Sequence, residues 1–446
     1  MTTAAPRARR TAKPIGLRHR LIASRGIAAS WAEFALAVIG ITIFTGAVIV
    51  RDVVFGVSAI SLEQLRFIAV PLTGLAIVWM ARNRQLALYL FTQQLWLFAL
   101  IAWAWMTTFW SVDPNTTQMR SLAILMSGLC ALGLRTRFDA MMLVRIVAIA
   151  LSVGTSLSVI QFMRGDPMVW DSLAWVGLRG VFTHKNLLGQ CCVMALILGA
   201  GLMLNKGPDR WLGVVVVLFA LRALWLSRSA TGLAASAIGL ALLGLIMAMV
   251  SPRIPQILKP WLAIAAGSAA LTAVVFKDRV INMLGRDVTL TGRDEIWDFA
   301  IDRIREEPLL GHGFRAYFTA PGNDAFIKFY FKGQQYDQAH SSVLQTMLDL
   351  GLVGFALLVG FVLITLVRAP QALTDPGRRI WVVLFIAVLI NAQTEALILS
   401  PTGFTWLVMQ IAAVAIAAGA NPRFLPAPAS ARHSRPPMRR ARPLAP

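Results

Sequence analysis

Charged residues are scarce in this chain. Of its 446 residues, 14% are charged and 57% are hydrophobic, whereas an ordinary soluble domain has about 25% charged residues. A soluble fold cannot bury that much apolar surface, because even a large globular chain leaves much of its surface in water. The composition therefore excludes a soluble globular protein and predicts one that lies in lipid.

Cysteine and histidine are also few. The three cysteines, Cys130, Cys191 and Cys192, lie in apolar stretches at spacings that fit neither a disulfide framework nor a zinc site. We expect them to be small buried hydrophobic side chains. Of the five histidines, His340 has no second histidine or carboxylate beside it at metal-ligand spacing. The sequence therefore predicts neither a metal site nor a cofactor.

Positive charge is in excess, with 42 Lys and Arg against 21 Asp and Glu and a net charge of +21. A basic chain can indicate nucleic-acid binding. Here, however, the excess lies in two tails, Arg7 to Arg25 and Arg423 to Arg442, and in short connectors between apolar runs. Cytoplasmic loops of membrane proteins have this distribution. We therefore predict contact with a lipid bilayer and no nucleic-acid partner.

Apolar runs recur along the chain at lengths that suit membrane helices, which need about 20 residues to cross a hydrocarbon core roughly 30 Å thick. The candidate spans are residues 31–50, 65–81, 86–106, 119–134, 141–162, 187–204, 211–226, 230–250, 261–276, 342–367, 380–398 and 403–420. This pattern predicts an all-α polytopic membrane protein with about 12 transmembrane helices. Because no A-x-A-like cleavage site follows Arg9 and Arg10, we expect the first span to be retained.

Orientation follows from the basic connectors. With the N-terminus in the cytoplasm, every inner connector carries at least two basic residues. The predicted organisation is a basic cytoplasmic tail (1–30), nine helices (31–276), a large outer loop (277–341), three helices (342–420) and a disordered basic cytoplasmic tail (421–446). Loops as long as the outer one are usually functional.

The large outer loop contains a predicted surface helix, Arg293 to Arg305. Thr291 to Asp294 fits a capping box at its start, and Pro308 stops it. We expect its apolar stripe to lie against the spans. The stripe consists of Ile296, Trp297, Phe299, Ala300 and Ile304.

Two arginines stand where an anion could bind. Arg228 lies at the outer junction of two apolar runs, and Arg293 opens the surface helix. A guanidinium matches phosphate oxygens, and a helix N-terminus attracts anions. The alternatives are that Arg228 snorkels to lipid headgroups and that Arg293 is an ordinary solvated side chain.

Histidine and further polar side chains lie at the ends of the outer loops. His340, just before an apolar run, is either a satisfied polar group or a general base for a sugar hydroxyl. Arg179, His184 and Lys185 form either a headgroup belt or the mouth of a sugar-binding site.

Two ionisable residues, Arg222 and Glu395, fall inside predicted spans, where such groups are functional candidates. We favour a buried pair between them that holds helices together.

Several runs resemble a known family. Leu290-Thr-Gly-Arg-Asp-Glu-Ile-Trp-Asp, continuing to Glu307-Pro-Leu-Leu-Gly-His-Gly-Phe314, resembles the large-loop signature of the O-antigen ligase and polymerase superfamily. So does Ala339-His-Ser-Ser-Val-Leu-Gln345, followed by Asp349-Leu-Gly-Leu-Val-Gly354. Gly180-Val-Phe-Thr-His-Lys-Asn-Leu-Leu-Gly189 is similar to the exopolysaccharide-polymerase branch, which makes succinoglycan-like polymers.

The resemblance implies an inverting, metal-independent glycosyltransferase at the periplasmic face of the bacterial inner membrane. Its donor and acceptor would both be undecaprenyl-diphosphate-linked glycans, with chain-length regulators and export proteins as partners. It assigns the leaving diphosphate to Arg228 and Arg293 and acceptor activation to His340. Ser341 follows this histidine where the family often has Asn, and a serine can also donate or accept.

Three alternatives remain on the sequence. An O-antigen ligase would transfer a finished glycan to another acceptor on the same scaffold. A transporter of polysaccharide or lipid-linked sugar also suits twelve spans, although the halves show no obvious internal repeat and no matched pair of broken helices. A structural component of an export assembly would leave His340 and the arginines dispensable.

Overall fold

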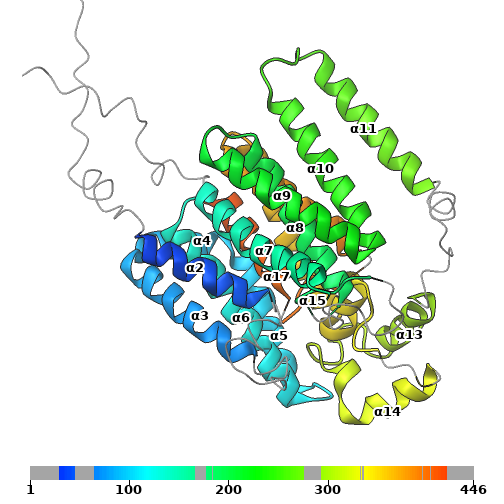
Figure 1. Cartoon of the computed structure of the whole chain (residues 1–446). Coiled ribbons are helices and arrows are strands. Elements are labelled where there is room, and N and C mark those ends of the chain that lie inside the picture. Colours follow the sequence, from blue (N-terminus) through cyan, green and yellow to red (C-terminus); the bar gives the residue numbers. More distant parts are fainter. Residues whose placement is uncertain are drawn as a thin grey trace, which may run out of the picture.

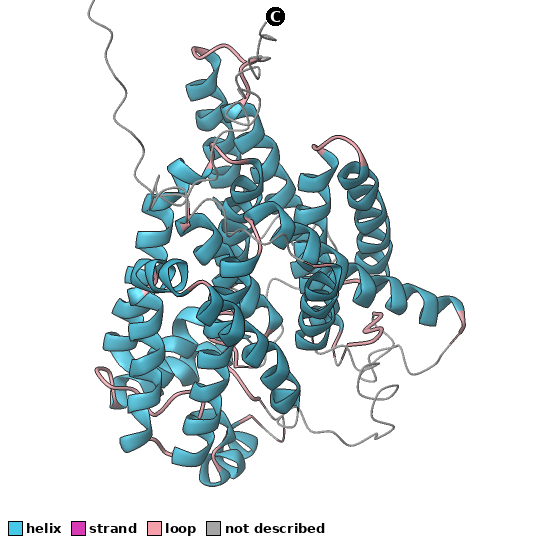
Figure 2. Cartoon of the chain, turned by 90° about the vertical axis from the view of Figure 1, so that its left-hand side faces the viewer, coloured by secondary structure: helices cyan, strands magenta, loops and turns pink. Residues whose placement is uncertain are grey.

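The computed structural model describes residues 30–45, 65–165, 177–182, 184–275, 293–331, 333, 336–393, 395–401 and 403–418. Over these ranges the chain is a bundle of α-helices with short 3₁₀ turns and without a β-strand (Figures 1 and 2). The all-α prediction is therefore confirmed for this part of the chain. Both basic tails, and Thr291 and Gly292 of the predicted capping box, lie outside the described residues.

The helices follow one another with short connections. The first half of the chain holds α2 (Trp31–Phe44), α3 (Leu65–Arg82), α4 (Arg84–Gln93), α5 (Leu95–Met106), η2 (Thr107–Phe109), α6 (Pro114–Arg137), α7 (Ala140–Met163), α8 (Lys185–Met203) and α9 (Pro208–Ser227). The second half holds α10 (Ala230–Val250), α11 (Leu258–Val275), α13 (Arg293–Glu306), η4 (Tyr317–Thr319), α14 (Pro321–Tyr330), α15 (Ser342–Ala372), α16 (Pro376–Asn391) and α17 (Phe404–Ala417).

Six of the described helices are long and apolar enough to cross a membrane, namely α6 to α10 and α15. The bent pair α4 and α5 passes the same test as one unit, and α2, α17 and Val70–Arg82 of α3 are shorter apolar helices. The fold is thus that of a polytopic membrane protein. The count of twelve spans stays a prediction.

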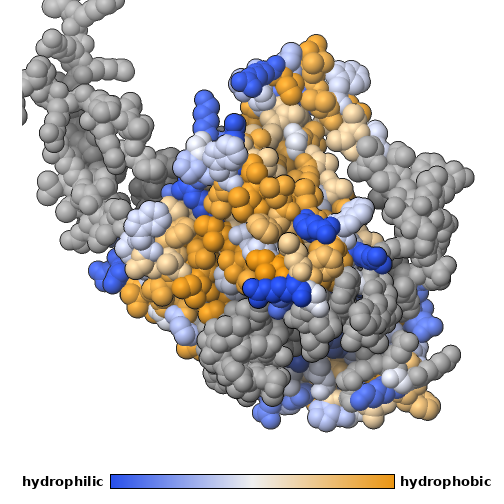
Figure 3. All heavy atoms as spheres, viewed as in Figure 1, coloured by the Kyte–Doolittle hydropathy of each residue, from blue (hydrophilic) through white to orange (hydrophobic). Residues whose placement is uncertain are grey.

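Apolar side chains cover the outside of the bundle as well as its core. On α9, Trp211, Leu218 and Trp225 are 70%, 61% and 78% exposed, and Figure 3 shows such residues as a broad orange field on one face. Water would not tolerate a patch of this size in a monomeric protein, whereas lipid tails solvate it. The three cysteines are free and buried in the core, as predicted.

The predicted span 86–106 is broken in the structure. Its two halves, α4 and α5, meet at Gln94 with a bend of 76°. The side chain of Gln94 is buried and donates a hydrogen bond to the carbonyl of Ala413 at 3.1 Å. A polar residue in an apolar run therefore marks a change of direction here, where hydropathy predicted a continuous helix.

The predicted span 380–398 is too long. Helix α16 ends at Asn391, and residues 395–401 are not helical. The side chains of Ala396 to Leu399 are buried by protein, so their hydropathy reflects a protein environment rather than lipid. This correction moves Glu395 out of a helix and into a connection between α16 and α17.

Helix α13 confirms the predicted surface helix and its apolar stripe. Ile296, Phe299, Ala300 and Ile304 are buried. They form a second core with side chains from η4, α14 and the start of α15, namely Tyr317, Phe318, Ile327, Phe331 and Leu348. The large loop is therefore a packed unit attached to the bundle.

The large loop is attached at a kink in α15. Gly351 breaks this helix with φ 65° and ψ −168°, which releases backbone groups from their helical partners. Three backbone hydrogen bonds bind residues 308–313 there: Leu352 N to the carbonyl of Pro308 (2.9 Å), His312 N to Leu348 (2.9 Å) and Gly313 N to Asp349 (3.1 Å). Two of the signature runs, 307–314 and 349–354, are thus bound to each other.

A buried charge pair follows the kink. Arg315 Nε lies 3.8 Å from Asp349 Oδ2, with side chains only 8% and 2% exposed. Gln345 donates to the same carboxylate at 2.9 Å. Burial lowers the pKa of Arg315, and the nearby Asp349 carboxylate opposes this shift. Because a lone buried charge is costly, each partner needs the other.

We expect Gly351→Ala to weaken the fold. A Cβ at this position would lie 2.2 Å from the carbonyl oxygen of Leu309, and the backbone conformation itself costs a non-glycine residue about 1–3 kcal/mol. The melting temperature of the purified protein should fall clearly. The matched control is Gly244→Ala in α10, where a Cβ meets nothing within 4 Å. Equal melting temperatures for the two variants would contradict this account of the kink.

Arg315→Met should also destabilise the protein, by about 3–5 kcal/mol, because it leaves Asp349 buried and uncompensated. Thermal unfolding can test this against Arg305→Ala. Arg305 makes a 3.0 Å pair with Asp302 in which both side chains are more than half exposed, so its loss should cost about 1 kcal/mol at most. A similar effect of both variants would show that the buried pair is not needed.

Candidate active site

His340 lies in a tight turn at the start of α15. Its φ is 48°, in the left-handed region. On one side, Ala339 N donates to the side chain of Gln345 at 2.8 Å. On the other, Ser341 is the N-cap of α15 and accepts from Leu344 N at 3.4 Å. Ser341 thus takes a capping role in this protein, and its hydrogen bond helps to hold the turn that presents His340.

A carboxylate faces His340. Nδ1 of His340 lies 3.5 Å from Glu395 Oε2, and the two side chains are 25% and 5% exposed. The contact is too long and too bent for a hydrogen bond, as is common for catalytic groups before substrate binds. The pair that we predicted between Glu395 and Arg222 is wrong. Arg222 is exposed on α9, with its guanidinium 5.7 Å from the ring centroid of Phe162.

Glu395 is held by the backbone around it. Ser342 Oγ donates to the carbonyl of Glu395 at 2.9 Å and accepts from Ile398 N at 3.1 Å. Arg315 donates to the carbonyls of Ala396 and Ile398 at 3.1 and 3.4 Å. The buried charge pair at the kink therefore also fixes the segment that carries Glu395.

The other outer loop comes to the same place. Asn186, in the first turn of α8, directs its side-chain amide to Glu395 Oε1 at 3.5 Å. Leu178 N donates to the carbonyl of Leu226 at 3.0 Å, which binds residues 177–182 to the end of α9. At Gly177 a Cβ would lie 2.1 Å from the carbonyl oxygen of Ser227 and 3.1 Å from Lys185 Cδ. The loop, the start of α8 and the end of α9 are therefore in close contact.

The predicted binding residues gather around this contact. Arg228 is the C-cap of α9, exposed and left-handed with φ 50°. Lys185 is the first residue of α8 and is half-buried, and Arg179 in the loop is also half-buried. His184 is the N-cap of α8, where its Nδ1 accepts from Asn186 N at 3.1 Å. Asn186 and Glu395 connect this group to His340.

Arg293 occupies the first position of α13. Trp297, one helical turn further on, donates from Nε1 to the carbonyl of Ala339 at 3.1 Å. The start of α13 is therefore next to the residue that precedes His340. The backbone thus brings all three regions of predicted site residues to one end of the bundle.

Backbone strain is concentrated at this site. Among the described residues, four that are not glycine have a left-handed φ: Arg228, Arg315, His340 and Leu399. Each such residue costs of the order of 1 kcal/mol or more, and strain of this kind tends to be kept at functional sites. Two of the four are residues that the sequence singled out. The other two belong to the network that holds Glu395.

The groups that meet here could serve as a base and an anion site. One imidazole stands beside a buried carboxylate, with several cationic side chains nearby. Within the ranges that the structure describes, no group of three His, Cys, Asp or Glu side chains could hold a metal ion. Sequence reasoning missed the site roles of Glu395 and Arg315. The signal for Glu395 was the polar run Asn391 to Glu395 inside an apolar stretch.

Comparisons with known proteins agree with this picture. A family model described as O-antigen ligase matches residues 193–359, a range that includes Arg228, Arg293 and His340. The chain is also 27% identical over 292 residues to the exopolysaccharide production protein ExoQ of Rhizobium meliloti (strain 1021). This match covers 62% of the chain and 65% of that protein, which is less than two thirds of the relative's length. Together with the helical membrane fold, the two similarities identify the chain as a member of the O-antigen ligase and exopolysaccharide polymerase family.

Proposed function

We propose that this protein is a membrane glycosyltransferase that polymerises undecaprenyl-diphosphate-linked oligosaccharide repeats into an exopolysaccharide. The reaction takes place at the periplasmic face of the bacterial inner membrane. The observation that supports it most directly is the contact between His340 Nδ1 and the buried carboxylate of Glu395. The cationic residues at the start of α8 and the end of α9 stand close to this pair.

His340 acts as the general base. Because its Nδ1 faces Glu395, the other ring nitrogen, Nε2, is available to accept a proton. Nε2 takes the proton of an acceptor sugar hydroxyl as the hydroxyl oxygen forms a bond to the anomeric carbon of the donor. On the opposite face, the bond from that carbon to the diphosphate oxygen breaks and its electron pair leaves with the lipid diphosphate. The anomeric carbon is therefore inverted.

Glu395 positions this base. A carboxylate beside Nδ1 selects the tautomer with Nδ1 protonated and stabilises the imidazolium that forms during the reaction. Its own burial and its contact with Asn186 restrict where it can lie. The strained backbone of His340 serves the same purpose, because it sets the direction of the imidazole before substrate arrives.

Arg228 and Arg293 neutralise the leaving diphosphate. Fixed cations aimed at developing negative charge can replace a divalent metal ion in this role. Arg179, His184 and Lys185 bind the same donor or its first sugars. The polyprenyl tail remains in hydrocarbon, against the apolar outer faces of the spans.

The same chemistry supports a second candidate, an O-antigen ligase, and the description of the matching family model favours it. The printed name of the relative favours exopolysaccharide production. The acceptor decides between them. A polymerase would work beside chain-length regulators and export proteins.

The direct test uses purified protein in nanodiscs with a synthetic polyprenyl-diphosphate oligosaccharide repeat and EDTA. We expect a ladder of repeat multiples when products are sized by mass spectrometry. If wild-type protein forms product only when a different acceptor is added, the ligase assignment replaces the polymerase. If no acceptor yields product but the lipid-linked sugar crosses a sealed membrane, the protein is a transporter.

His340→Ala should abolish turnover while donor binding persists. Glu395→Gln should lower the turnover rate by about 10²-fold or more, because it keeps the side chain's shape but loses the charge that stabilises the imidazolium. Product formation and donor binding, measured on the same folded preparations, separate these effects. Normal polymer length from a stably folded His340→Ala variant would remove this histidine from the chemistry.

Arg228→Ala and Arg293→Ala should each weaken donor binding by about 10- to 100-fold, since each removes a charge-assisted contact to diphosphate. Binding of a fluorescent polyprenyl diphosphate provides the readout. Matched controls lie at the far ends of the same helices, Arg210→Ala in α9 and Arg305→Ala in α13. Both control residues are exposed, and their removal should leave the affinity unchanged. Equal losses for control and site variants would indicate only a general effect of charge.

A further inference from the structure

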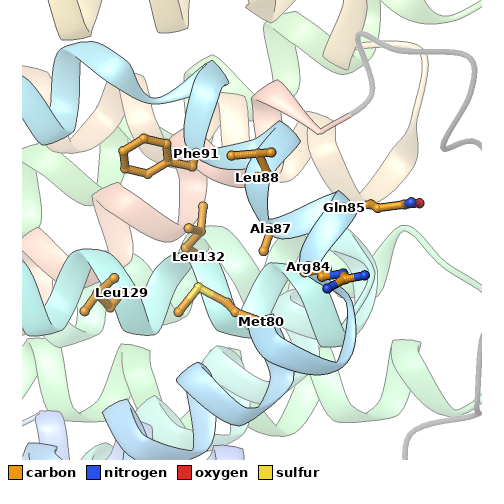
Figure 4. A pocket seen from close by; sticks show the side chains of 8 residues that line it. All are labelled: Met80, Arg84, Gln85, Ala87, Leu88, Phe91, Leu129 and Leu132. Atoms are coloured by element: carbon orange, nitrogen blue, oxygen red, sulfur yellow. The ribbon is translucent and has the colours of Figure 1, made fainter.

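An open groove lies between α3, α4 and α6 (Figure 4). Its volume is about 580 Å³. Figure 4 shows Arg84 and Gln85 at one end, with Phe91 and Leu129 toward the other. The remaining side chains along it, Met80, Ala87, Leu88 and Leu132, are apolar.

The groove is separate from the candidate active site. Helix α6 meets the large loop at Arg120, whose guanidinium donates to the carbonyl of Arg315 and, at 3.0 Å, to Thr319 Oγ1. Leu132 lies twelve residues further along the same helix, which corresponds to about 18 Å. The donor and acceptor of the proposed reaction therefore have no need of this groove.

The lining has the chemistry of an amphiphile site. Its length is apolar, and Leu88 and Phe91 on its edge are 64% and 37% exposed. Its one charged side chain, Arg84, is also exposed. The side chain of Arg82 on the same connector is 70% exposed and lies 3.5 Å from Glu33. A hydrocarbon chain suits the length of the groove, and a negative headgroup suits its arginine end.

We propose that this groove binds an anionic phospholipid, with an acyl chain along Ala87, Phe91 and Leu132 and the headgroup phosphate at Arg84. A guanidinium can donate two hydrogen bonds to one phosphate. Anionic rather than zwitterionic lipid is expected, because no carboxylate lines the groove to receive the amine of phosphatidylethanolamine. The lipid joins α3, α4 and α6 at the point where α4 bends away from α5.

Native mass spectrometry of the purified full-length protein tests the site. The probes are phosphatidylglycerol and phosphatidylethanolamine with identical acyl chains, added in equal amounts. Wild-type protein should retain phosphatidylglycerol about tenfold more, the factor expected for one charge-assisted contact. Arg84→Ala should lose this preference. Arg253→Ala removes another exposed arginine, in the connector before α11, and should keep it.

A second variant tests the apolar part of the groove. Ala87→Phe fills the space in front of Leu132, so it should reduce retention of both lipids while Arg84 is still present. Equal retention of the two lipids by wild-type protein would overturn the proposal. So would an unchanged preference in Arg84→Ala, which is an exposed substitution and should not impair folding. If Ala87→Phe does not fold, the Arg84 and Arg253 variants still decide the question.

Discussion

The break in α15 at Gly351 is the feature on which the rest of the site depends. A helix in apolar surroundings has no water to satisfy the N–H and C=O groups that a kink releases. Residues 308–313 of the large loop supply those partners, and Trp103 Nε1 donates to the carbonyl of Leu350 at 3.0 Å. The loop is therefore bound at one point of the bundle. Arg315 follows directly and carries the constraint onward to Asp349 and to the segment that holds Glu395.

This chain of contacts explains why strain and function coincide. A left-handed residue persists only where its surroundings hold it there. At His340 the hydrogen bonds of Ala339 and Ser341 do so from both sides. At Arg315 the guanidinium is held by a buried carboxylate and two carbonyls. The imidazole and the carboxylate of the candidate site thus project from backbone that has little freedom to move, which suits a base that must meet a hydroxyl in one geometry.

Hydropathy describes two different environments in this protein with the same letters. The outward residues of α9 are apolar because they face lipid, and Ala396 to Leu399 are apolar because protein buries them. A window of sequence cannot separate the two cases. For this reason the prediction located the helices well where apolar runs are long, as in α7 and α10, and failed at Gln94 and beyond Asn391. In both places a buried polar side chain makes a contact with a distant part of the chain.

By itself, the sequence determined that the protein is helical and membrane-bound, that a surface helix begins at Arg293, and that His340, Arg228 and the loop before α8 merit attention. Composition and helical periodicity are local properties, and the signature runs are short. Only the tertiary structure decided that Glu395 faces His340 rather than Arg222, that runs 307–314 and 349–354 are bound to each other, and that Arg315 is buried. Each of these depends on contacts between residues that are far apart in the chain, and no local pattern encodes which distant partner satisfies a buried polar group.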